Sequence, residues 1–302
     1  MIKICTVILE YQNPQMTLET IASLKKAVIP EGFVHQIVVV DNSPIPDGSL
    51  AKALKKQPEI KLISPMQNTG FAKGNNLGIK YGLKNKAKLF LLLNNDVIVD
   101  RNFLVNLVKS ITAGADMVTP KIYFAPGCEF HKDRYQSSEL GKVIWYAGAN
   151  FDWNNVYSRH NGIDEVDQGQ YDQSQETELA NFCCALIKKE VFKKIGLLDE
   201  KYFLYWEDGD FSVRAKRAGF KLMFEPQSKI WHRNSGSSGS GSKLHDYYLT
   251  RNRLLFGFKY AKFRTKLALI RETITKLFAG RPGEKQGIID FYLHRLGKGN
   301  NV

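Results

Sequence analysis

Two stretches of the chain place acidic and amide side chains directly after a run of bulky apolar residues. In the first stretch, the apolar residues 89–93 lead into Asn94, Asn95 and Asp96. Hard cations such as Mg²⁺ take oxygen ligands and commonly bind one or two protein carboxylates, with substrate phosphates and water completing the shell. Asp96 is therefore a candidate metal ligand. The alternative is that these side chains form a turn or cap the helix that follows.

The second stretch holds three carboxylates within four positions. Residues 203–206 are bulky, and Glu207, Asp208 and Asp210 follow them at the start of a predicted helix. Acidic residues in a first helical turn interact favourably with the helix dipole, which is the structural alternative. A helix cap needs only one acid, however, and a carboxylate held beside Trp206 and close to a sugar could act as a general base for a hydroxyl nucleophile.

Two further ring side chains are candidates for the same site. His232 ends a short apolar strand and is either a histidine of the core or a metal ligand. Trp145 lies in the aromatic and polar stretch 123–178, where we expect loops and hairpins over the edge of a sheet. Such rings could offer flat surfaces to a ring-shaped ligand, although packing in the core is the alternative for each of them.

The elements that must position these residues alternate between strands and helices. This alternation predicts an α/β fold with a mostly parallel sheet flanked by helices, whose ligands bind beyond the carboxyl ends of the strands. Apolar runs typical of strands covered on both faces occur at 2–9, 35–42, 60–63 and 89–100. Helical patterns occur at 17–26 and 49–56, and residues 68–76 lead into a third predicted helix that ends at Leu83. Further strands are predicted at 116–120, 178–187, 221–224 and 230–232, and further helices at 189–195 and 207–218.

Absent motifs narrow the function. The glycine-rich stretch 68–76 follows the third predicted strand and is not G-x-G-x-x-G, which disfavours a dinucleotide-dependent dehydrogenase. No G-x-x-x-x-G-K-[ST] occurs either. We therefore expect a nucleotide to be bound by side chains at strand ends, such as Asp41. A nucleotidyltransferase stays open, although it would need a basic phosphate-binding loop after the first strand, and residues 10–13 supply none.

Positive charge is concentrated at the C-terminal end. The net charge is +13, and residues 243–302 hold 13 Lys or Arg against 4 Asp or Glu, a net +9. This region is predicted to be helical, with an apolar stripe at Leu267, Ile270, Ile274, Leu277 and Phe278. Such a basic amphipathic helix suits an anionic membrane surface, or packs on the domain with a solvated outer face. A nucleic-acid-binding protein is disfavoured, because the basic residues are not interleaved with exposed aromatics through a sheet.

Cysteine usage and hydropathy bear on the compartment. The four cysteines lack metal-type spacing, which fits a reduced, cytosolic setting. No signal-peptide pattern and no run of about 18 apolar residues occurs, so we expect no membrane span. Residues 234–242, NSGSSGSGS, are expected to form a mobile loop.

Six motifs in this order resemble the inverting glycosyltransferases of family 2 with the GT-A fold, of the bacterial rhamnosyltransferase type. They lie at residues 6–11, 39–43, 68–76, 93–96, 203–210 and 247–253. The resemblance implies a catalytic domain over 1–242, in which 1–100 bind the nucleotide and 101–242 the acceptor. Residues 243–302 would form a basic, amphipathic helical extension.

The resemblance also implies roles for individual residues. Asp96 falls on the last acid of the family's D-x-D motif, which holds Mn²⁺ or Mg²⁺ against the donor diphosphate. The first acid is Asn94 here, so metal binding would depend more on His232, which matches a metal-binding histidine of some members. Asp208 aligns with the catalytic base, beside Glu207. Donor-binding residues would be Tyr11, Asp41, Asn68, Gly70, Asn75, Asn95 and Asp96, and acceptor-binding residues Trp206 and Trp145.

The implied reaction moves a sugar, with inversion, from dTDP-rhamnose or a UDP-sugar to a hydroxyl of a lipid-linked or oligosaccharide acceptor. Relatives of this kind assemble bacterial surface polysaccharides. The enzyme would work in the cytoplasm at the inner face of the membrane, docked through residues 243–302, or would use that region to form a homodimer. The serine- and glycine-rich loop after His232 would close over the donor and exclude water.

Overall fold

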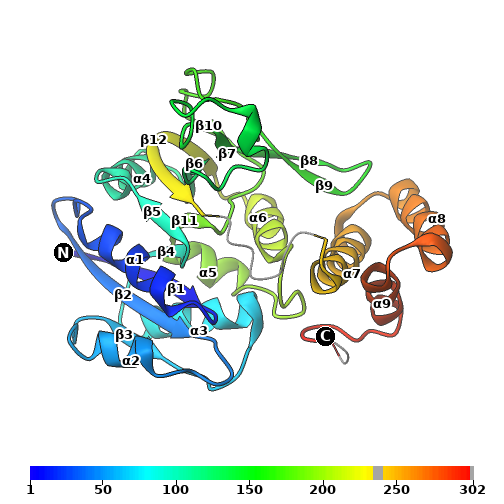
Figure 1. The fold of residues 1–302 in the computed structure, drawn as a ribbon, viewed down its shortest axis with the longest axis horizontal. Helices are drawn as coiled ribbons and strands as arrows, with labels where there is room; N and C mark the ends of the chain where they lie inside the picture. Colours follow the sequence, from blue (N-terminus) through cyan, green and yellow to red (C-terminus); the bar gives the residue numbers. More distant parts are fainter. Residues whose placement is uncertain (234–240, 300–302) are drawn as a thin grey trace.

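A computed structural model describes residues 1–233 and 241–299 of the chain. Residues 234–240, and with them most of the loop expected to close over the donor, lie outside the described part. The described elements form a layered α/β unit followed by three helices (Figure 1). The α/β class expected from the sequence is confirmed.

The first hundred residues build four parallel strands joined by helical crossovers. The elements are β1 (Ile2–Glu10), α1 (Pro14–Lys25), β2 (Phe33–Asp41), α2 (Ser49–Leu54), β3 (Lys61–Ile63), α3 (Gly70–Lys84) and β4 (Leu89–Asn94). β1 pairs in parallel with both β2 and β4, and β3 extends the sheet beyond β2. Helix α1 begins at a proline, and the side chain of Asn13 caps it by accepting a hydrogen bond from the N–H of Met16 (3.2 Å).

The second half of the sheet mixes strand directions. It contains β5 (Val97–Val99), α4 (Phe103–Thr112), β6 (Met117–Phe124), β11 (Cys184–Lys188), α5 (Lys189–Ile195), α6 (Glu207–Arg217) and β12 (Leu222–His232). β11 runs antiparallel between β4 and β6, and β12 runs parallel to β6. Two predictions were wrong. The strand expected over 89–100 turns at residues 95–96 and becomes β4 and β5, and the two short strands expected over 221–232 are one strand with a bulge between Glu225 and Lys229.

Helices cover both faces of the sheet. Alternate residues of β1 point to opposite sides, so that Ile4 and Ile8 pack in the cluster beneath α1, α2 and α4, whereas Cys5 and Val7 pack beneath α3, α5 and α6. All four side chains are fully buried. A strand covered on both faces explains why this part of the sequence is apolar without alternation.

The region 123–178 consists of short hairpins and loops, as expected. It holds η1 (Lys132–Arg134), β7 (Ile144–Tyr146), β8 (Ala149–Asp152), β9 (Tyr157–His160) and β10 (Gln175–Glu176). The buried ammonium group of Lys121 lies 2.9 Å from Asp167 and 2.7 Å from Asp172 and ties the region to β6. Tyr146 is fully buried, so packing in the core is the role of that aromatic residue.

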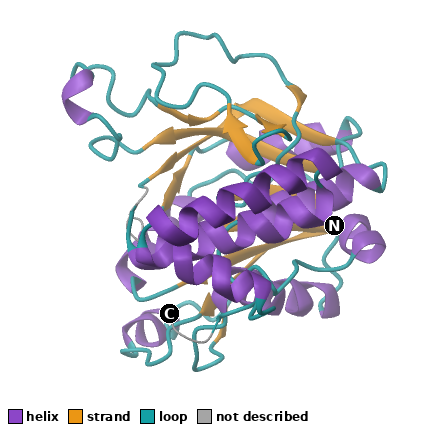
Figure 2. Cartoon of the chain, turned by 90° about the vertical axis from the view of Figure 1, so that its right-hand side faces the viewer, coloured by secondary structure: helices purple, strands orange, loops and turns teal. Residues whose placement is uncertain are grey.

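Three helices follow the sheet: α7 (Lys243–Tyr260), α8 (Phe263–Ala279) and α9 (Pro282–Tyr292). Figure 2 looks onto them with the sheet behind. Asp210 joins α6 to α7, because its carboxylate accepts hydrogen bonds from Lys259 (2.6 Å) and Tyr260 (2.6 Å). Within the described residues, no helix combines the length and the apolar character needed to cross a membrane.

Candidate active site

The carboxyl ends of β1, β2 and β4 lie level with one another. Glu10 pairs in register with Asp41, and Leu9 pairs with Asn94. The polar residues that end these strands are therefore brought to one edge of the sheet, where α/β folds bind ligands. Tyr11 follows β1 at this edge and is half-buried.

Asn42 organises the nucleotide side of this edge. Its Oδ1 accepts hydrogen bonds from the backbone N–H (2.9 Å) and the hydroxyl (2.7 Å) of Thr69. Its Nδ2 donates to Oδ1 of Asn68 (3.2 Å) and to the carbonyl of Gly70 (3.3 Å). Asp41 is buried beside it. From the sequence we assigned Asp41, Asn68 and Gly70 to the donor site but missed Asn42. The position of Asn42 directly after a strand-end carboxylate was a usable signal.

Glu10 is a second residue that the sequence reasoning missed. Its buried carboxyl group accepts hydrogen bonds from the N–H of Asn13 (2.6 Å) and the hydroxyl of Ser43 (2.9 Å). Burial, together with a hydrogen bond to Asp41, raises the pKa of Glu10 to about 7. Near neutral pH this group is therefore partly protonated and can share its proton with the neighbouring carboxylate.

The amides predicted at the edge differ in their surroundings. Asn75 is buried in α3, where its Nδ2 donates to the carbonyl of Phe71 (3.0 Å). The Nδ2 of Asn95 donates to the hydroxyl of Thr17 in α1 (3.1 Å). Both side chains thus bond to helices beside the site. Asn94 ends β4 at the edge itself and is half-buried.

Asp96 and His232 form a candidate metal-binding pair. β5 pairs with β12 so that Val97 lies opposite His232, which brings Oδ1 of Asp96 to 3.1 Å from Nε2 of the histidine. Both side chains are buried, and the ring of Trp145 packs edge-on against the imidazole with centroids 4.8 Å apart. A carboxylate and an imidazole at this spacing fit a divalent cation that takes further ligands from phosphates and water. The part of the chain that the structure describes contains no group of three or more acidic, His or Cys residues that could hold a metal.

Glu207 and Asp208 begin α6 in different environments. Burial, followed by the charge of Asp208, holds the pKa of Glu207 well above its ordinary value, which favours its neutral form. Burial also raises the pKa of Asp208, to about 6, while hydrogen bonds from the N–H groups of Gly209 (2.7 Å) and Phe182 oppose the rise. Asp208 is half-buried and is the ionised member of the pair at neutral pH. It can therefore accept a proton.

One backbone segment, residues 181–184, connects this carboxylate to the end of β4. The N–H of Phe182 bonds to Asp208, and the carbonyl of Cys183 accepts a hydrogen bond from the N–H of Asn94 (2.9 Å). Asp96 lies two residues beyond Asn94. The candidate metal pair and the candidate base are therefore attached to the same short segment.

The residues before Glu207 have an unusual backbone. Phe203, Tyr205 and Trp206 have φ angles of 58°, 67° and 74°, a region that bulky residues rarely adopt. Asn252 of α7 holds this segment, because its Nδ2 donates to the carbonyls of residues 202, 204 and 205 at 2.6, 2.7 and 3.0 Å. The ring of Trp206 packs against Phe256 of the same helix, with centroids 4.8 Å apart.

The same segment contacts the nucleotide side. The N–H of Phe71 donates to the carbonyl of Phe203 (2.5 Å). Gly70 permits this approach, since its φ is +80° and a Cβ atom there would lie 2.5 Å from the Phe203 ring. Gly70 thus allows close packing between the start of α3 and the segment that precedes α6.

Comparison with models of known families decides the family of the chain. The model described as glycosyl transferase family 2 matches residues 5–196, more than half of the sequence. The chain belongs to this family. The match covers Asp96 and the residues around Asp41, Asn42 and Asn68 that are predicted to bind the nucleotide, which we call the nucleotide edge. Asp208 and His232 lie beyond the end of the match.

Curated relatives of this family 2 chain are distant. It is 25% identical over 191 residues to a low-salt glycan biosynthesis hexosyltransferase of Haloferax volcanii, over 63% of this chain and 56% of the relative. It is also 25% identical to the dTDP-rhamnosyl transferase RfbF of Shigella flexneri, over 72% of this chain and 69% of the relative. A stretch of 62 residues, 20% of each chain, is 32% identical to N-acetylglucosaminyl-diphospho-decaprenol L-rhamnosyltransferase of Mycobacterium tuberculosis. The match thus covers little more than half the length of the first relative.

Solved structures share the fold of this family 2 chain. GalNAc-T7 with UDP, GalNAc and Mn²⁺ matches 96% of this chain and 54% of its own, with a TM-score of 0.66 and 17% identity. The mannosyltransferase PcManGT from Pyrobaculum calidifontis, in complex with GDP-Man and Mn²⁺, matches 95% of this chain and 73% of its own, with a TM-score of 0.53 and 13% identity. The GT-A fold expected from the resemblance is confirmed.

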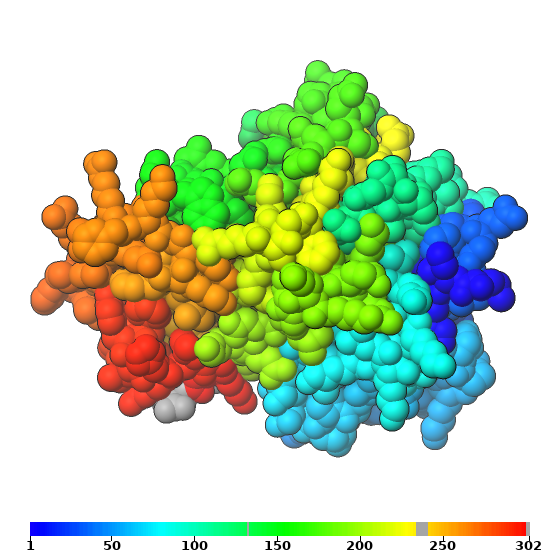
Figure 3. Space-filling view, turned by 180° about the vertical axis from the view of Figure 1, so that it is seen from behind, coloured from blue at the N-terminus to red at the C-terminus, as the bar shows by residue number. Residues whose placement is uncertain are grey.

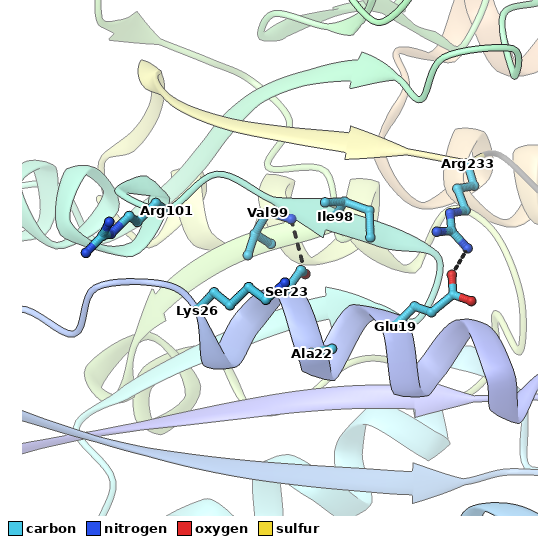
Figure 4. Close-up of a pocket in the computed structure, with 8 residues that line it drawn as sticks. All are labelled: Glu19, Ala22, Ser23, Lys26, Ile98, Val99, Arg101 and Arg233. Carbon is cyan, nitrogen blue, oxygen red and sulfur yellow. Dashed lines mark hydrogen bonds and ion pairs between the residues drawn. The ribbon is translucent and has the colours of Figure 1, made fainter.

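A cavity of about 750 Å³ lies apart from the residues predicted for the family 2 site. It is bounded by α1, β5 and the residue after β12 (Figure 4). Glu19 pairs there with Arg233, and the hydroxyl of Ser23 accepts a hydrogen bond from the N–H of Val99 (3.3 Å). None of its lining residues belongs to the nucleotide edge, the metal pair or the base.

Proposed function

We propose that the chain transfers a sugar from a nucleotide-diphosphate donor to a hydroxyl group, with inversion at the anomeric carbon and with the help of a divalent cation. The observation that carries this proposal is the joint attachment of the Asp96–His232 pair and of Asp208 to residues 181–184, at the ligand-binding edge of a family 2 fold. A cation site and a general base at one edge are the two parts that such a transfer requires.

The proposed chemistry of the chain is proton acceptance by Asp208. The carboxylate takes the proton of the acceptor hydroxyl while the hydroxyl oxygen bonds to the anomeric carbon. The bond from that carbon to the diphosphate oxygen breaks, and its electron pair leaves with the diphosphate. Attack from the side opposite the diphosphate inverts the configuration. The raised pKa of Glu207 favours its protonated form, and Asp208 is proposed to be the charged member of the pair.

Asp96 and His232, with the amide oxygen of Asn94, would hold Mn²⁺ or Mg²⁺. When bound, the cation neutralises the charge that develops on the leaving diphosphate. Of these two ions, Mn²⁺ is the proposed one. The two solved neighbours that contain Mn²⁺ support this choice.

The proposed donor is dTDP-rhamnose or a UDP-sugar. A dTDP-rhamnosyl transferase among the relatives and a neighbour solved with UDP support these two classes. We propose that residues 1–100 bind the nucleotide through Tyr11 and the residues around Asp41, and that residues 101–242 bind the acceptor with Trp145 and Trp206.

The proposed acceptor is a lipid-linked or oligosaccharide hydroxyl, met in the cytoplasm at the inner face of the membrane. The mycobacterial relative, whose name specifies a diphospho-decaprenol, supports a lipid-linked acceptor. The basic region 243–302 supports this location, because its net charge of +9 attracts anionic lipids.

A thermal-stabilisation screen with a panel of sugar nucleotides, each with and without Mn²⁺, tests the proposal. A matching donor should raise the melting temperature, and more so with Mn²⁺, because a ligand that binds only the folded state stabilises it. A product assay then separates the alternatives. Release of nucleoside diphosphate supports glycosyl transfer, whereas release of pyrophosphate from a nucleoside triphosphate would indicate a nucleotidyltransferase. Stabilisation by no sugar nucleotide would contradict the proposal.

A further inference from the structure

Exposed apolar side chains gather on the last two described helices. Among the described residues, half of the large hydrophobic side chains that are exposed lie between residues 263 and 293, in about a tenth of the chain. Six of them belong to α8 and form what we call the α8 row: Phe263, Leu267, Ile270, Ile274, Leu277 and Phe278. Their exposed fractions reach 76% at Phe263 and 81% at Phe278. Figure 3 shows this part of the chain, in orange, at one end of the molecule with side chains projecting from it.

The α8 row does not face the rest of the chain. The opposite side of α8 makes the contacts, since Leu269 is buried in the cluster that includes Phe256 and Leu254. On the same side the hydroxyl of Thr265 donates to the carbonyl of Trp153 (3.3 Å), and the hydroxyls of Thr273 and Tyr292 lie 3.1 Å apart. The helix is thus held by its inner face, and packing on the domain does not account for the outer one.

The spacing of the α8 row keeps it on a single narrow face. Its members follow one another at intervals of four, three, four and three residues and end in the adjacent pair 277–278. At 3.6 residues per turn, these positions fall within an arc of about 100°. The cations Arg264 and Arg271 flank one side of the arc and Lys266 the other. Residues 262–271 hold four cations and no acid.

The charges beside the α8 row select its occupant. A second copy of α8 packed along this seam would place one face flanked by Arg264, Lys266 and Arg271 against another such face, which is unfavourable. The nearest acid, Glu272, is already paired with Arg253 (2.7 Å) and Lys276 (3.2 Å). An anionic lipid surface offers both an apolar layer for the row and negative charge for its flanks.

We propose that the α8 row is the surface by which this chain binds an anionic membrane, lying in the plane of the headgroups. The inference deepens the location proposed above and does not depend on the chemistry of the active site. It is tested without substrate, so its failure would leave the transfer reaction untouched.

Co-sedimentation of the full chain with lipid vesicles tests the inference. We compare phosphatidylcholine vesicles with vesicles that also contain phosphatidylglycerol, at low and at high salt. The chain should bind the anionic vesicles at least tenfold more tightly, and high salt should remove most of this preference. Equal binding to both vesicle types, or binding to neither, would overturn the inference.

Two double variants of α8 and one control variant test whether α8 is the binding surface. Ile274→Ser with Phe278→Ser removes part of the row, and Arg264→Gln with Arg271→Gln removes flanking charge; each should weaken binding to anionic vesicles about tenfold or more. Ile45→Ser with Met66→Ser changes two exposed apolar residues elsewhere and should bind like the parent. The melting temperature of each variant checks that it is folded. Unchanged vesicle binding by either α8 variant would overturn the inference, and so would a dimer in sedimentation velocity that only the row variant dissociates, which would identify a second copy as the occupant.

Discussion

At the scale of single residues, two neighbouring carboxyl groups at the start of α6 lie in different environments. Glu207 is buried, which raises its pKa well above the ordinary value, whereas Asp208 has a pKa raised to about 6 and two backbone N–H groups that favour its charged form. A base needs a pKa just below the working pH, so that it is ionised yet still attracts a proton. The environment of Asp208 meets this requirement.

Replacing that base should abolish most of the activity. Asp208→Asn keeps the shape of the side chain but cannot accept a proton, so we expect the transfer rate to fall about 10²- to 10⁴-fold. Stabilisation by the donor should remain. In the parent, kcat should decline as the pH falls below about 6, because the carboxylate becomes protonated. Glu207→Gln imitates a neutral acid and should lose far less activity. A rate for Asp208→Asn within about threefold of the parent would show that another group is the base.

The metal pair makes a separate prediction. Asp96→Ala should weaken the binding of a nucleoside diphosphate at least about tenfold while leaving the binding of the nucleoside nearly unchanged, because a cation held by Asp96 would act on the phosphates. Calorimetric titration of both ligands with Mn²⁺ measures the difference. In the parent, excess chelator should likewise weaken the binding of the nucleoside diphosphate and leave the binding of the nucleoside nearly unchanged. Full activity in chelator would point to a site that uses Lys or Arg in place of a metal.

The protonation of Glu10, at the nucleotide edge, affects the free energy of unfolding. Its pKa is about 7 in the folded protein, against an ordinary value of 4.5, so the folded state binds this proton more tightly than the unfolded state does. The protonated Glu10 therefore stabilises the folded state. This stabilisation is complete below about pH 4.5 and is lost as the pH rises through about 7. Glu10→Gln imitates the protonated group, and at pH 8 it should raise the free energy of unfolding by up to about 3 kcal/mol relative to the parent. Urea unfolding at pH 5 and pH 8 measures the free energy of unfolding of the parent and of the variant. If this free energy changes equally with pH in both proteins, Glu10 is not the group responsible.

At the scale of elements, α7 supports the strained segment that precedes α6. Three carbonyls converge on Nδ2 of Asn252, and Arg251 donates to the carbonyls of residues 201 and 202 at 3.3 Å. We therefore expect Asn252 to help position Asp208. The motif 247–253 contributed to the family resemblance, and this contact gives it a physical role.

Asn252→Ala should lower kcat about tenfold or more, with little change in the KM of the donor, because Asp208 would be less well positioned while the nucleotide edge stays intact. The assay is run well below the melting temperature, so that global unfolding does not enter. Asn85→Ala, which removes an amide that donates to the carbonyl of Tyr81 (2.8 Å) at the end of α3, is the matched control. Equal loss in kcat and in donor affinity, or equal loss in the control, would mean that Asn252 only stabilises the fold.

The sequence predicted the alternation of elements well, because strands covered on both faces produce long apolar runs that a single sequence reveals. It could not predict the left-handed backbone at Phe203, Tyr205 and Trp206, since these residue types are unfavourable there and only tertiary contacts maintain them. The adjacency of Asp96 and His232 depends on pairing between β5 and β12, which are distant in the chain. The motif resemblance implied only that both residues bind the metal, and the strand register explains how they come together.

At the scale of the whole molecule, one carboxylate joins the α/β unit to the C-terminal helices. Asp210 is fully buried and lies 2.7 Å from Arg214 and 2.6 Å from Lys259. Burial alone would raise its pKa, but the charge of Arg214 and hydrogen bonds from Lys259 and Tyr260 hold the pKa below its usual range. Of the three acids at the start of α6, this one serves structure.

Asp210→Ala should reduce the free energy of unfolding by about 2–4 kcal/mol, because it removes the buried carboxylate that pairs with both Arg214 and Lys259, and the partial exposure of Lys259 limits the loss. Urea unfolding measures the change. Asp199→Ala removes a more exposed contact with the same lysine, at 3.3 Å, and an exposed hydrogen bond from the N–H of Lys201 (3.1 Å), and should change stability by less than about 1 kcal/mol. Similar losses in both variants would show that the buried joint contributes little.

The attachment of Asp208 and of the end of β4 to residues 181–184 has a thermodynamic consequence. If one substrate displaces this segment, the binding site of the other should shift with it, and we then expect the two affinities to be coupled. Reciprocity then requires that the donor change the affinity for the acceptor by the same factor as the acceptor changes the affinity for the donor. Calorimetric titration of each substrate at saturating concentrations of the other, with Asp208→Asn to prevent turnover, would give that factor twice from independent measurements.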